Sequence, residues 1–291
     1  MVNALTVDVE DYFHVQAFAD VISPSDWSHF PMRVERNTCR LLDLFERHGV
    51  RATFFILGWV AERCPELVSN IRNAGHEIGC HGFRHQMIGR GNRKEFRDDI
   101  HRAKTTLEDL AGVSVKSYRA PSYSITGDTL WALEILHDAG FEYDSSIFPV
   151  LHDQYGIPDA PRFPHYKFLS GNNVIIEFPP STLSVYGVNF PVAGGGYFRL
   201  LPYPLTAWAI RRINVKESQP AMFYVHPWEI DPEQPRIAAP LRSRFRHYQN
   251  LHSTEEKLTR LLDEFLWAPM SEVLVASLTD VNSRGEVGNG F

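Results

Sequence analysis

Residues 77–85 read Glu-Ile-Gly-Cys-His-Gly-Phe-Arg-His, a short apolar run that ends in two histidines four positions apart. The turn signal at residues 73–75, Asn-Ala-Gly, precedes it, so residues 77–80 are predicted to form a buried strand. If the chain turns helical after this strand, His81 and His85 lie one turn apart and can bind one cation. Imidazole nitrogen suits Zn²⁺ or a similar transition metal. The pair alone is a weak indication, and the surrounding chain has to support it.

Short apolar runs alternate with amphipathic segments on both sides of this stretch. Strands are expected at residues 4–7, 52–57, 77–80, 174–178 and 221–225, and helices at residues 34–48, 59–73, 94–110, 129–139 and 254–267. Such alternation predicts βαβ units and a mostly parallel sheet, so the fold class is α/β. A count of about seven strands favours a closed or nearly closed barrel over an open sheet. Residues 149–171 lack periodicity and are expected to form a long ordered loop.

Composition excludes several classes of protein. The 291 residues are 44% apolar and 12% aromatic, enough for a sizeable core. A formal charge of −6 argues against nucleic acid as a partner. No run of 18 apolar residues predicts a transmembrane helix, and the first residues lack the basic and apolar regions of a signal peptide. We therefore expect a cytoplasmic protein, whose three scattered cysteines are reduced core thiols.

Polar side chains gather where several predicted strands end. They are Asp8, His81, Arg119, Asp144 and His226. A parallel α/β barrel carries its chemistry at the carboxyl ends of its strands. The sequence therefore predicts one site built from these ends.

The residue types at these ends suit hydrolysis of an amide. Among Asp8, Glu10 and Asp11, one carboxylate can bind a metal and another can act as general base. Two histidines and one carboxylate leave open positions on the metal, as catalytic sites do. Arg119 can pair with the base, and His226 can donate a proton to a leaving amine. Together these groups form the full set for metal-assisted amide hydrolysis.

Four ordered motifs resemble those of the polysaccharide deacetylase superfamily, the chitooligosaccharide-deacetylase-like carbohydrate esterases. They lie at residues 5–8, 81–85, 119–123 and 225–227, and the resemblance runs from about residue 4 to residue 230. It implies a distorted (β/α) barrel of about seven strands that removes N-acetyl groups from N-acetylglucosamine polymers or O-acetyl groups from xylan. Later segments, such as residues 226–232, resemble a subgroup found with bacterial exopolysaccharide gene clusters.

The first motif departs from the family pattern, which has two adjacent aspartates. Val9 follows Asp8 here, and Glu10 and Asp11 come next. The resemblance assigns Asp8 as the catalytic base and His226 as the catalytic acid. The third metal ligand then moves to Glu10, on the same strand face as Asp8, with Asp11 as the alternative.

The remaining candidate residues support the acid or bind substrate. Asp144 or Glu177 could orient His226. Tyr123, in the third motif, and Trp228, two residues past the acid, are candidates for substrate binding, and Trp228 could stack on a sugar ring. The glycines at residues 194–196 match no phosphate loop and are expected to allow a tight turn or an approach of the backbone to the substrate groove.

The sequence thus predicts a metal-dependent hydrolase that removes N-acetyl groups from N-acetylhexosamine units of a bacterial polysaccharide. Its cofactor would be one divalent metal, with zinc the first choice, and its partner a polysaccharide or oligosaccharide substrate. The alternatives are a hydrolase of a small cyclic or linear amide, which should have a closed pocket, and an inactive carbohydrate-binding barrel, which should not hold metal. The oligomeric state stays open.

Residues 1–235 are expected to form the barrel, and residues 236–291 a C-terminal extension packed on it. A lipid-linked precursor at the inner face of the membrane would reconcile a cytoplasmic enzyme with a polysaccharide substrate.

Overall fold

The structure is a computed structural model and describes residues 1–89, 92–152 and 155–283. Its strands are β1 (Val2–Val9), β2 (Thr53–Ile56), β3 (Glu77–Cys80), β4 (Ser117–Tyr118), β5 (Tyr143–Asp144), β6 (His165–Phe168), β7 (Val174–Glu177), β8 (Thr182–Val185), β9 (Val188–Pro191), β10 (Met222–Val225) and β11 (Leu266–Ala268). Its α-helices are α1 (Val34–Arg47), α2 (Gly58–Arg63), α3 (Pro65–Asn73), α4 (Arg93–Ala111), α5 (Trp131–Asp138), α6 (Gly195–Leu200), α7 (Tyr203–Lys216), α8 (Leu241–Tyr248), α9 (Thr254–Glu264) and α10 (Met270–Ser283).

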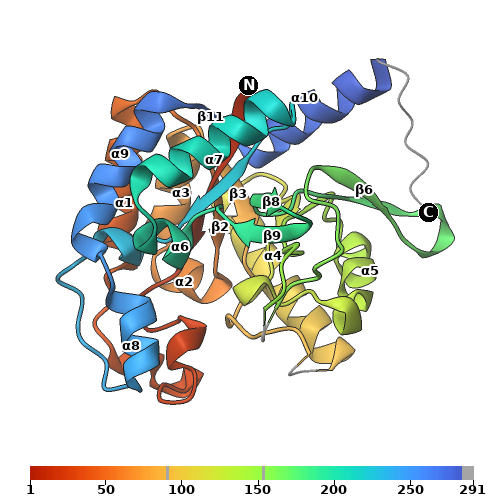
Figure 1. The fold of residues 1–291 in the computed structure, drawn as a ribbon. Coiled ribbons are helices and arrows are strands. Elements are labelled where there is room, and N and C mark those ends of the chain that lie inside the picture. Colours follow the sequence, from red (N-terminus) through yellow and green to blue (C-terminus); the bar gives the residue numbers. More distant parts are fainter. Residues whose placement is uncertain (90–91, 153–154, 284–291) are drawn as a thin grey trace.

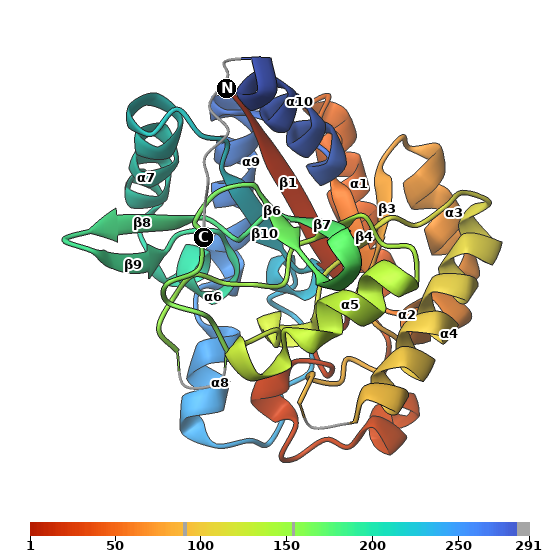
Figure 2. The ribbon, with the colours of Figure 1, turned by 90° about the vertical axis from the view of Figure 1, so that its right-hand side faces the viewer.

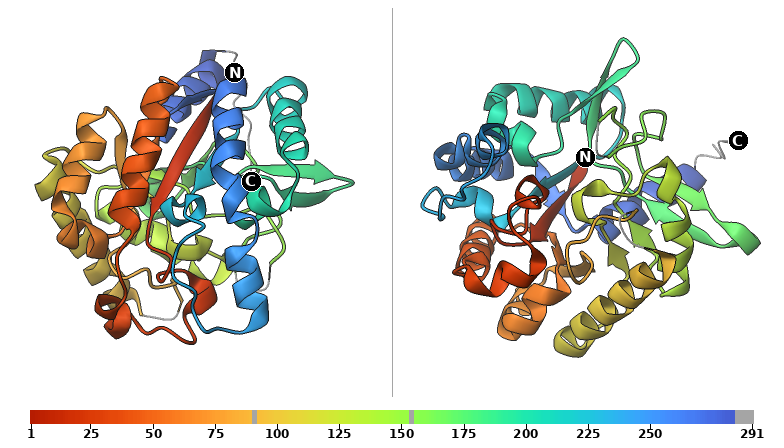
Figure 3. Two further views of the ribbon diagram at one scale, coloured as in Figure 1. Left: turned by 90° about the vertical axis from the view of Figure 1, so that its left-hand side faces the viewer. Right: turned by 90° about the horizontal axis from the view of Figure 1, so that it is seen from below.

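One mixed sheet organises the molecule (Figure 1). Its strands follow the order β10-β1-β2-β3-β4-β5-β7-β6, and β11 pairs with β1. Every neighbouring pair from β10 to β7 is parallel, whereas β6 is antiparallel to β7. Helices lie around the strands when the molecule is seen from below (Figure 3). The predicted α/β fold, a distorted barrel with seven parallel strands in succession, is confirmed.

The gap between β7 and β10 is filled by the chain that precedes α6. Met222 N donates to Ser181 Oγ (2.7 Å), and Tyr224 N donates to Ala193 O (2.7 Å). Gly194 forms a parallel bridge with Tyr224, and a Cβ atom at Gly194 would lie 1.9 Å from the carbonyl oxygen of Tyr224. Only glycine at this position allows the two backbones to approach so closely.

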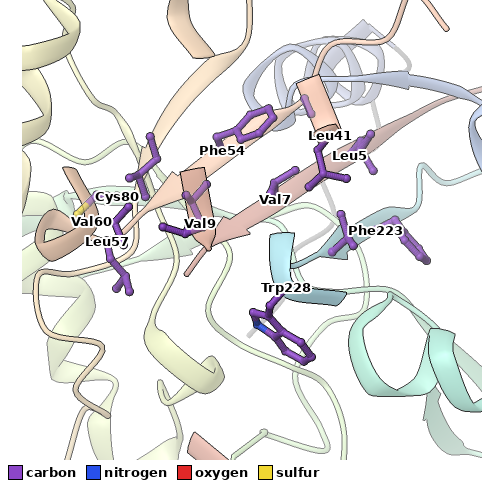
Figure 4. Packing of buried hydrophobic residues seen from close by; sticks show 14 of the residues in the cluster. Leu5, Val7, Val9, Leu41, Phe54, Leu57, Val60, Cys80, Phe223 and Trp228 are labelled. Carbon is purple, nitrogen blue, oxygen red and sulfur yellow. The ribbon is translucent and has the colours of Figure 1, made fainter. Parts of the chain in front are cut away.

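Strand β1 separates the hydrophobic core from the polar interior of the barrel. Leu5, Val7 and Val9 are fully buried and pack with Leu41 of α1 and Phe54 of β2 (Figure 4). The alternate residues of β1 point to the other face, because side chains of a strand alternate. Asp8 therefore faces the barrel interior.

Different helices lie at the two ends of the barrel, as Figure 2 shows for α10 and α8. At one end, Met270 and Leu274 of α10 pack with Ala4, Phe55 and Met222. At the other end, where the parallel strands finish, α8 lies beside the segment that follows β1. The ring of its His247 is 4.7 Å from that of Phe18.

Local structure differs from expectation in a few places. Pro65 begins a new helix, so the segment expected as one helix is divided into α2 and α3. The loop expected at residues 149–171 contains β6, which forms an antiparallel pair with β7. The β8–β9 hairpin was not predicted. Within the described residues, no helix is both long and apolar enough to cross a membrane.

Candidate metal and catalytic site

The segment after β3 brings the two histidines together without a helix. Residues 81–87 have no helical structure, and His85 takes a positive φ of 49°. The carboxylate of Asp99 on α4 fixes this loop by accepting a hydrogen bond from Phe83 N (2.7 Å). The helical turn expected between the histidines is therefore wrong. The turn is made by Gly82, with φ of 74°, and by the left-handed backbone at His85.

Three buried side chains converge beside the end of β1. They are Glu10, His81 and His85. Each offers one ligand atom, and these three atoms lie within 4.8 Å of one another. Glu10 Oε2 is only 2.7 Å from His85 Nε2, yet within the described chain it lacks a hydrogen bond of acceptable geometry. Because these two atoms are close together but not aligned for a hydrogen bond, both can bind the same cation. The donor set fits a divalent transition metal.

The hydrogen bonds and charges around these ligands favour the forms that bind metal. His81 Nδ1 lies 2.8 Å from Arg119 O, and because a carbonyl only accepts, Nδ1 carries the proton and Nε2 the lone pair. Burial lowers the pKa of His81 to about 4, so its ring is neutral near pH 7. Burial raises the pKa of Glu10, but the imidazoles of His85, His226 and His81 together lower it by more, so the carboxylate is ionised well below its ordinary range.

Asp8 sits next to this cluster and is held by a buried guanidinium. Arg119 is fully buried, and its Nη1 donates to Asp8 Oδ1 and to Thr6 Oγ1, each at 2.7 Å. Arg119 Nη2 donates to Ser145 Oγ (2.9 Å). These contacts leave Asp8 Oδ2 facing His226 Nε2 at 3.9 Å.

His226 follows β10 and has a carboxylate behind it. Its Nδ1 lies 3.2 Å from Glu229 Oε2, and Glu229 Oε1 accepts from Arg199 Nε at 2.7 Å. Burial lowers the pKa of His226, but the charges of Glu229, Glu10 and Asp8 raise it to about 9. The ring therefore presents Nε2 toward Asp8 and Glu10 in its protonated form.

Glu229 replaces the residues expected to orient His226. Asp144 and Glu177 are paired with each other: they occupy register positions on β5 and β7 and are both fully buried. Ser146 Oγ donates to Asp144 Oδ1 (2.5 Å), and Ile147 N donates to Glu177 Oε1 (3.0 Å). The expected orienting role was wrong because strand pairing brings these two carboxyls together. A signal for Glu229 was present, since Pro227 and an acid three residues after His226 are typical of a capped turn.

Asp11 is engaged elsewhere, so the alternative metal ligand is not supported. Its Oδ2 accepts from Arg33 N (2.6 Å) and Val34 N (2.9 Å), and its Oδ1 from Tyr12 N (2.9 Å). The carboxylate thus satisfies backbone groups at the start of α1.

The two expected substrate contacts are both buried and both line the cavity discussed next, and they differ in whether their polar atom has a hydrogen-bond partner. The indole of Trp228 stacks with the rings of His226 (5.1 Å) and His247 (4.2 Å), donates to Glu10 Oε1 (3.2 Å) and is 4% exposed. The indole thus supports the acid and a metal ligand, and its expected role as a sugar-stacking platform stays a prediction. Tyr123 has a buried hydroxyl with no hydrogen-bond partner in the described chain, and it lines the cavity discussed next.

A cavity of about 560 Å³ joins these groups to solvent. Asp8, Glu10 and His226 lie at its buried part, and Phe245 of α8, which is 64% exposed, lies at its open part. Its volume falls in the range of ligand sites of ~300–1,000 Å³. α6 and α8, which no sequence motif indicated, supply much of its wall through Tyr197, Leu200, Arg242, Phe245 and Arg246.

Two family models match consecutive parts of the chain. The model described as polysaccharide deacetylase matches residues 26–143, and that described as domain of unknown function (DUF3473) matches residues 145–275. The two matches meet at β5, so both regions supply strands to one sheet. The domain boundary expected at residue 235 stays a prediction.

Curated relatives match part of the chain. A peptidoglycan-N-acetylglucosamine deacetylase of Bacillus cereus is 40% identical over 98 residues, which are 33% of this chain and 36% of that protein. A peptidoglycan deacetylase of Helicobacter pylori is 33% identical over 125 residues, 43% of this chain and 42% of that protein. The chain therefore matches less than half the length of either relative.

Solved structures share the fold. A presumed polysaccharide deacetylase from Mycobacterium smegmatis has a TM-score of 0.62 at 20% identity, covering 100% of this chain and 93% of its own. Puue allantoinase has a TM-score of 0.59 at 13% identity, covering 94% and 88%. Identities this low are evidence for the fold alone.

Proposed function

Because the chain belongs to the polysaccharide deacetylase superfamily, we propose that it is a metal-dependent hydrolase of N-acetylhexosamine units in a bacterial polysaccharide. The reaction would release acetate and leave a free amine on the sugar. The proposed substrate is a bacterial exopolysaccharide, because later segments such as residues 226–232 resemble a subgroup found with exopolysaccharide gene clusters. Zinc is the proposed metal.

The convergence of Glu10, His81 and His85 beside Asp8 and His226 carries this proposal. A divalent metal bound by the first three would polarise the acetamide carbonyl and make a bound water more acidic. The stacking of Trp228 with His226 and His247, and its hydrogen bond to Glu10, keep bulk water from this end of the cavity.

Asp8 and His226 are proposed to move the protons. Asp8 Oδ2 is the oxygen atom not bound to Arg119, so it is free to take a proton from the attacking water. His226 Nε2, held by the Nδ1 contact to Glu229, then protonates the departing amine. The hydroxyl of Tyr123, the one candidate substrate contact with an unused donor, is placed to bind the substrate.

The shape of the cavity favours a polymer over a small amide. It extends from fully covered ligands to side chains that are largely exposed on α8. A glycan chain can enter such an opening, whereas a small cyclic amide would need enclosure. The complete ligand set argues against an inactive binding barrel.

Metal analysis combined with acetate release tests the proposal. Purified protein should contain one divalent metal per chain and release acetate from N-acetylglucosamine oligomers, and chelation should stop the reaction until zinc is restored. Asp8→Asn should retain the metal but lose turnover, because only the proton acceptor is removed. Full activity in metal-free protein would contradict the metal's role, and no acetate from metal-loaded protein would contradict the activity.

A further inference from the structure

Charge is divided between the two ends of the active-site cavity. Among the described residues, its lining contains two carboxylates, Asp8 and Glu10, and both are 2% exposed. Arg242 and Arg246, at the open end, are exposed. Within the described part of the chain, the lining residues that solvent can reach thus carry only positive formal charge. A substrate entering this cavity meets cations first.

The positive charge belongs to one segment of an otherwise acidic chain. No Asp or Glu occurs between Glu233 and Glu255, while Arg236, Arg242, Arg244 and Arg246 do, in a protein of formal charge −6. Of these four, Arg236 covers the ring of Tyr248 at 4.2 Å. The three arginines of α8 have no ion pair within the described residues. Their charge is therefore available to a ligand.

Helix α8 is fixed against the catalytic acid. His247 is 2% exposed, and its ring stacks on Trp228 with an interplanar angle of 20°. Its Nε2 lies 2.6 Å from Gln234 Oε1, and its carbonyl accepts from Arg199, the residue that also binds Glu229. This packing sets the distance between the α8 arginines and His226.

Helical periodicity places the two cavity arginines together. Arg242 and Arg246 are four residues apart and share a face, with Phe245 beside them. Arg244, on the same helix and equally exposed, does not line the cavity. The exposed ring of Phe245 offers the apolar surface on which a sugar face can pack.

We propose that Arg242 and Arg246 bind an anionic group of the glycan, a carboxylate or a phosphate, on a unit beyond the sugar that is deacetylated. The inference rests on the proposed function and specifies its substrate class. A guanidinium binds either anion through paired N–H donors, which an uncharged hydroxyl cannot match. The substrate would then be an acidic polysaccharide or a phosphate-bearing precursor.

Steady-state kinetics with matched substrates tests this. The substrates are neutral N-acetylglucosamine oligomers, oligosaccharides of equal length that alternate N-acetylglucosamine with glucuronic acid, and N-acetylglucosamine oligomers with a terminal phosphate. Wild type should have a lower KM for one anionic series than for the neutral one. The double variant Arg242→Gln/Arg246→Gln should raise that KM by about fivefold or more and leave kcat unchanged. The series that responds identifies carboxylate or phosphate.

Arg244→Gln is the control, because it removes the same charge from the same helix outside the cavity. The KM of this control for anionic substrates should stay at the wild-type value. Added salt should raise the KM for anionic substrates in wild type and in the control, but not in the double variant, which lacks the two arginines. Equal KM ratios in wild type and double variant would overturn the inference.

A binding experiment separates this result from failure of the proposed function. Calorimetry with the Asp8→Asn protein measures affinity for the same oligosaccharides without turnover. If no substrate is deacetylated but anionic oligomers bind through the two arginines, the catalytic proposal fails and the inference stands. If affinity is unchanged when the arginines are replaced, the inference fails.

Discussion

Two pairs of buried carboxyls lie at the carboxyl ends of the parallel strands, and their surroundings differ. Asp8 and Glu10 each have a nitrogen partner at 2.7 Å, Asp8 from Arg119 and Glu10 from His85. Asp144 and Glu177 have each other. Burial, followed by the charge of Asp144, raises the pKa of Glu177 well above its ordinary value, and the pKa of Asp144 is raised as well. Glu10 is therefore ionised, whereas burial and the neighbouring carboxyl favour the protonated form of Glu177.

A buried carboxyl at the catalytic end of the barrel is not necessarily part of the active site. Both pairs occupy the end of the barrel where chemistry is expected. Only the first pair lines the cavity and has nitrogen groups that stabilise two negative charges. The second pair supports the third motif instead, because Ser146, bound to Asp144, also accepts a hydrogen bond from Ala120 N (2.8 Å). The following predictions test this division.

Removing the nitrogen ligands should have the largest effect. His81→Ala/His85→Ala should lose the metal and, with it, all measurable deacetylation, because Glu10 alone cannot hold a divalent ion against water. Elemental analysis and acetate release measure both. His165→Ala, a histidine outside the cavity, is the control and should keep metal and activity. Full metal occupancy in the double variant, with circular dichroism of a folded protein, would show that the metal binds elsewhere.

His226→Ala tests the proposed acid beside Asp8 and Glu10. It should lower the rate on an acetamide by about 10²–10⁴, the usual contribution of one general acid. The loss should be smaller on an activated aryl acetate, whose leaving group needs no proton. Rates on both substrates, compared with wild type, measure the difference. Equal losses would assign His226 to oxyanion binding or substrate positioning.

Structural features that depend on neighbouring residues in the chain could be predicted from the sequence. The main strands and helices were predictable, because alternation of apolar residues and Gly or Pro stops are local signals. The two-residue strands β4 and β5 were expected only as short segments that end at Arg119 and Asp144, and the β8–β9 hairpin carries too little pattern to be recognised. The residues of the four motifs were identified because each motif is a short contiguous stretch that resembles the family pattern.

Partners across the barrel were not predictable. Whether Asp144 faces His226 or Glu177 depends on the register between β5 and β7, which one sequence does not specify. Trp228 lies two residues beyond the acid, yet its position between two imidazoles depends on α8, a remote segment. The sequence therefore indicated which groups take part, and the structure showed which of them meet.

Glu229→Gln tests the carboxylate that the structure assigns to His226. The variant should reduce kcat by about tenfold, as loss of an orienting partner does. Without the charge of Glu229 the pKa of His226 falls below its value of about 9, so the protonated acid is lost at lower pH. The basic limb of the kcat–pH profile should then move to lower pH. An unmoved limb would contradict the role of Glu229.

Unfolding is followed in parallel, because Arg199 loses its buried ion pair in this variant. Rates are compared only below the unfolding transition of the variant. An unchanged KM would separate the loss of acid strength from general damage to the cavity.

Glu177→Gln should have the smallest effect on turnover, within about twofold, because Glu177 does not line the cavity. Its effect is on stability. In the unfolded chain Glu177 releases its proton near its ordinary pKa, whereas in the folded protein it keeps the proton to higher pH. The folded state then binds more protons, so the free energy of unfolding falls as pH rises, by up to about 1.4 kcal/mol per pH unit.

Gln keeps the oxygen that accepts from Ile147 N but cannot ionise, which removes this slope. Urea unfolding at about pH 5 and about pH 8 should therefore show the variant gaining stability relative to wild type at the higher pH. A wild-type slope in the variant would mean that Glu177 does not keep its proton in the folded protein, and the contrast with Glu10 would be lost.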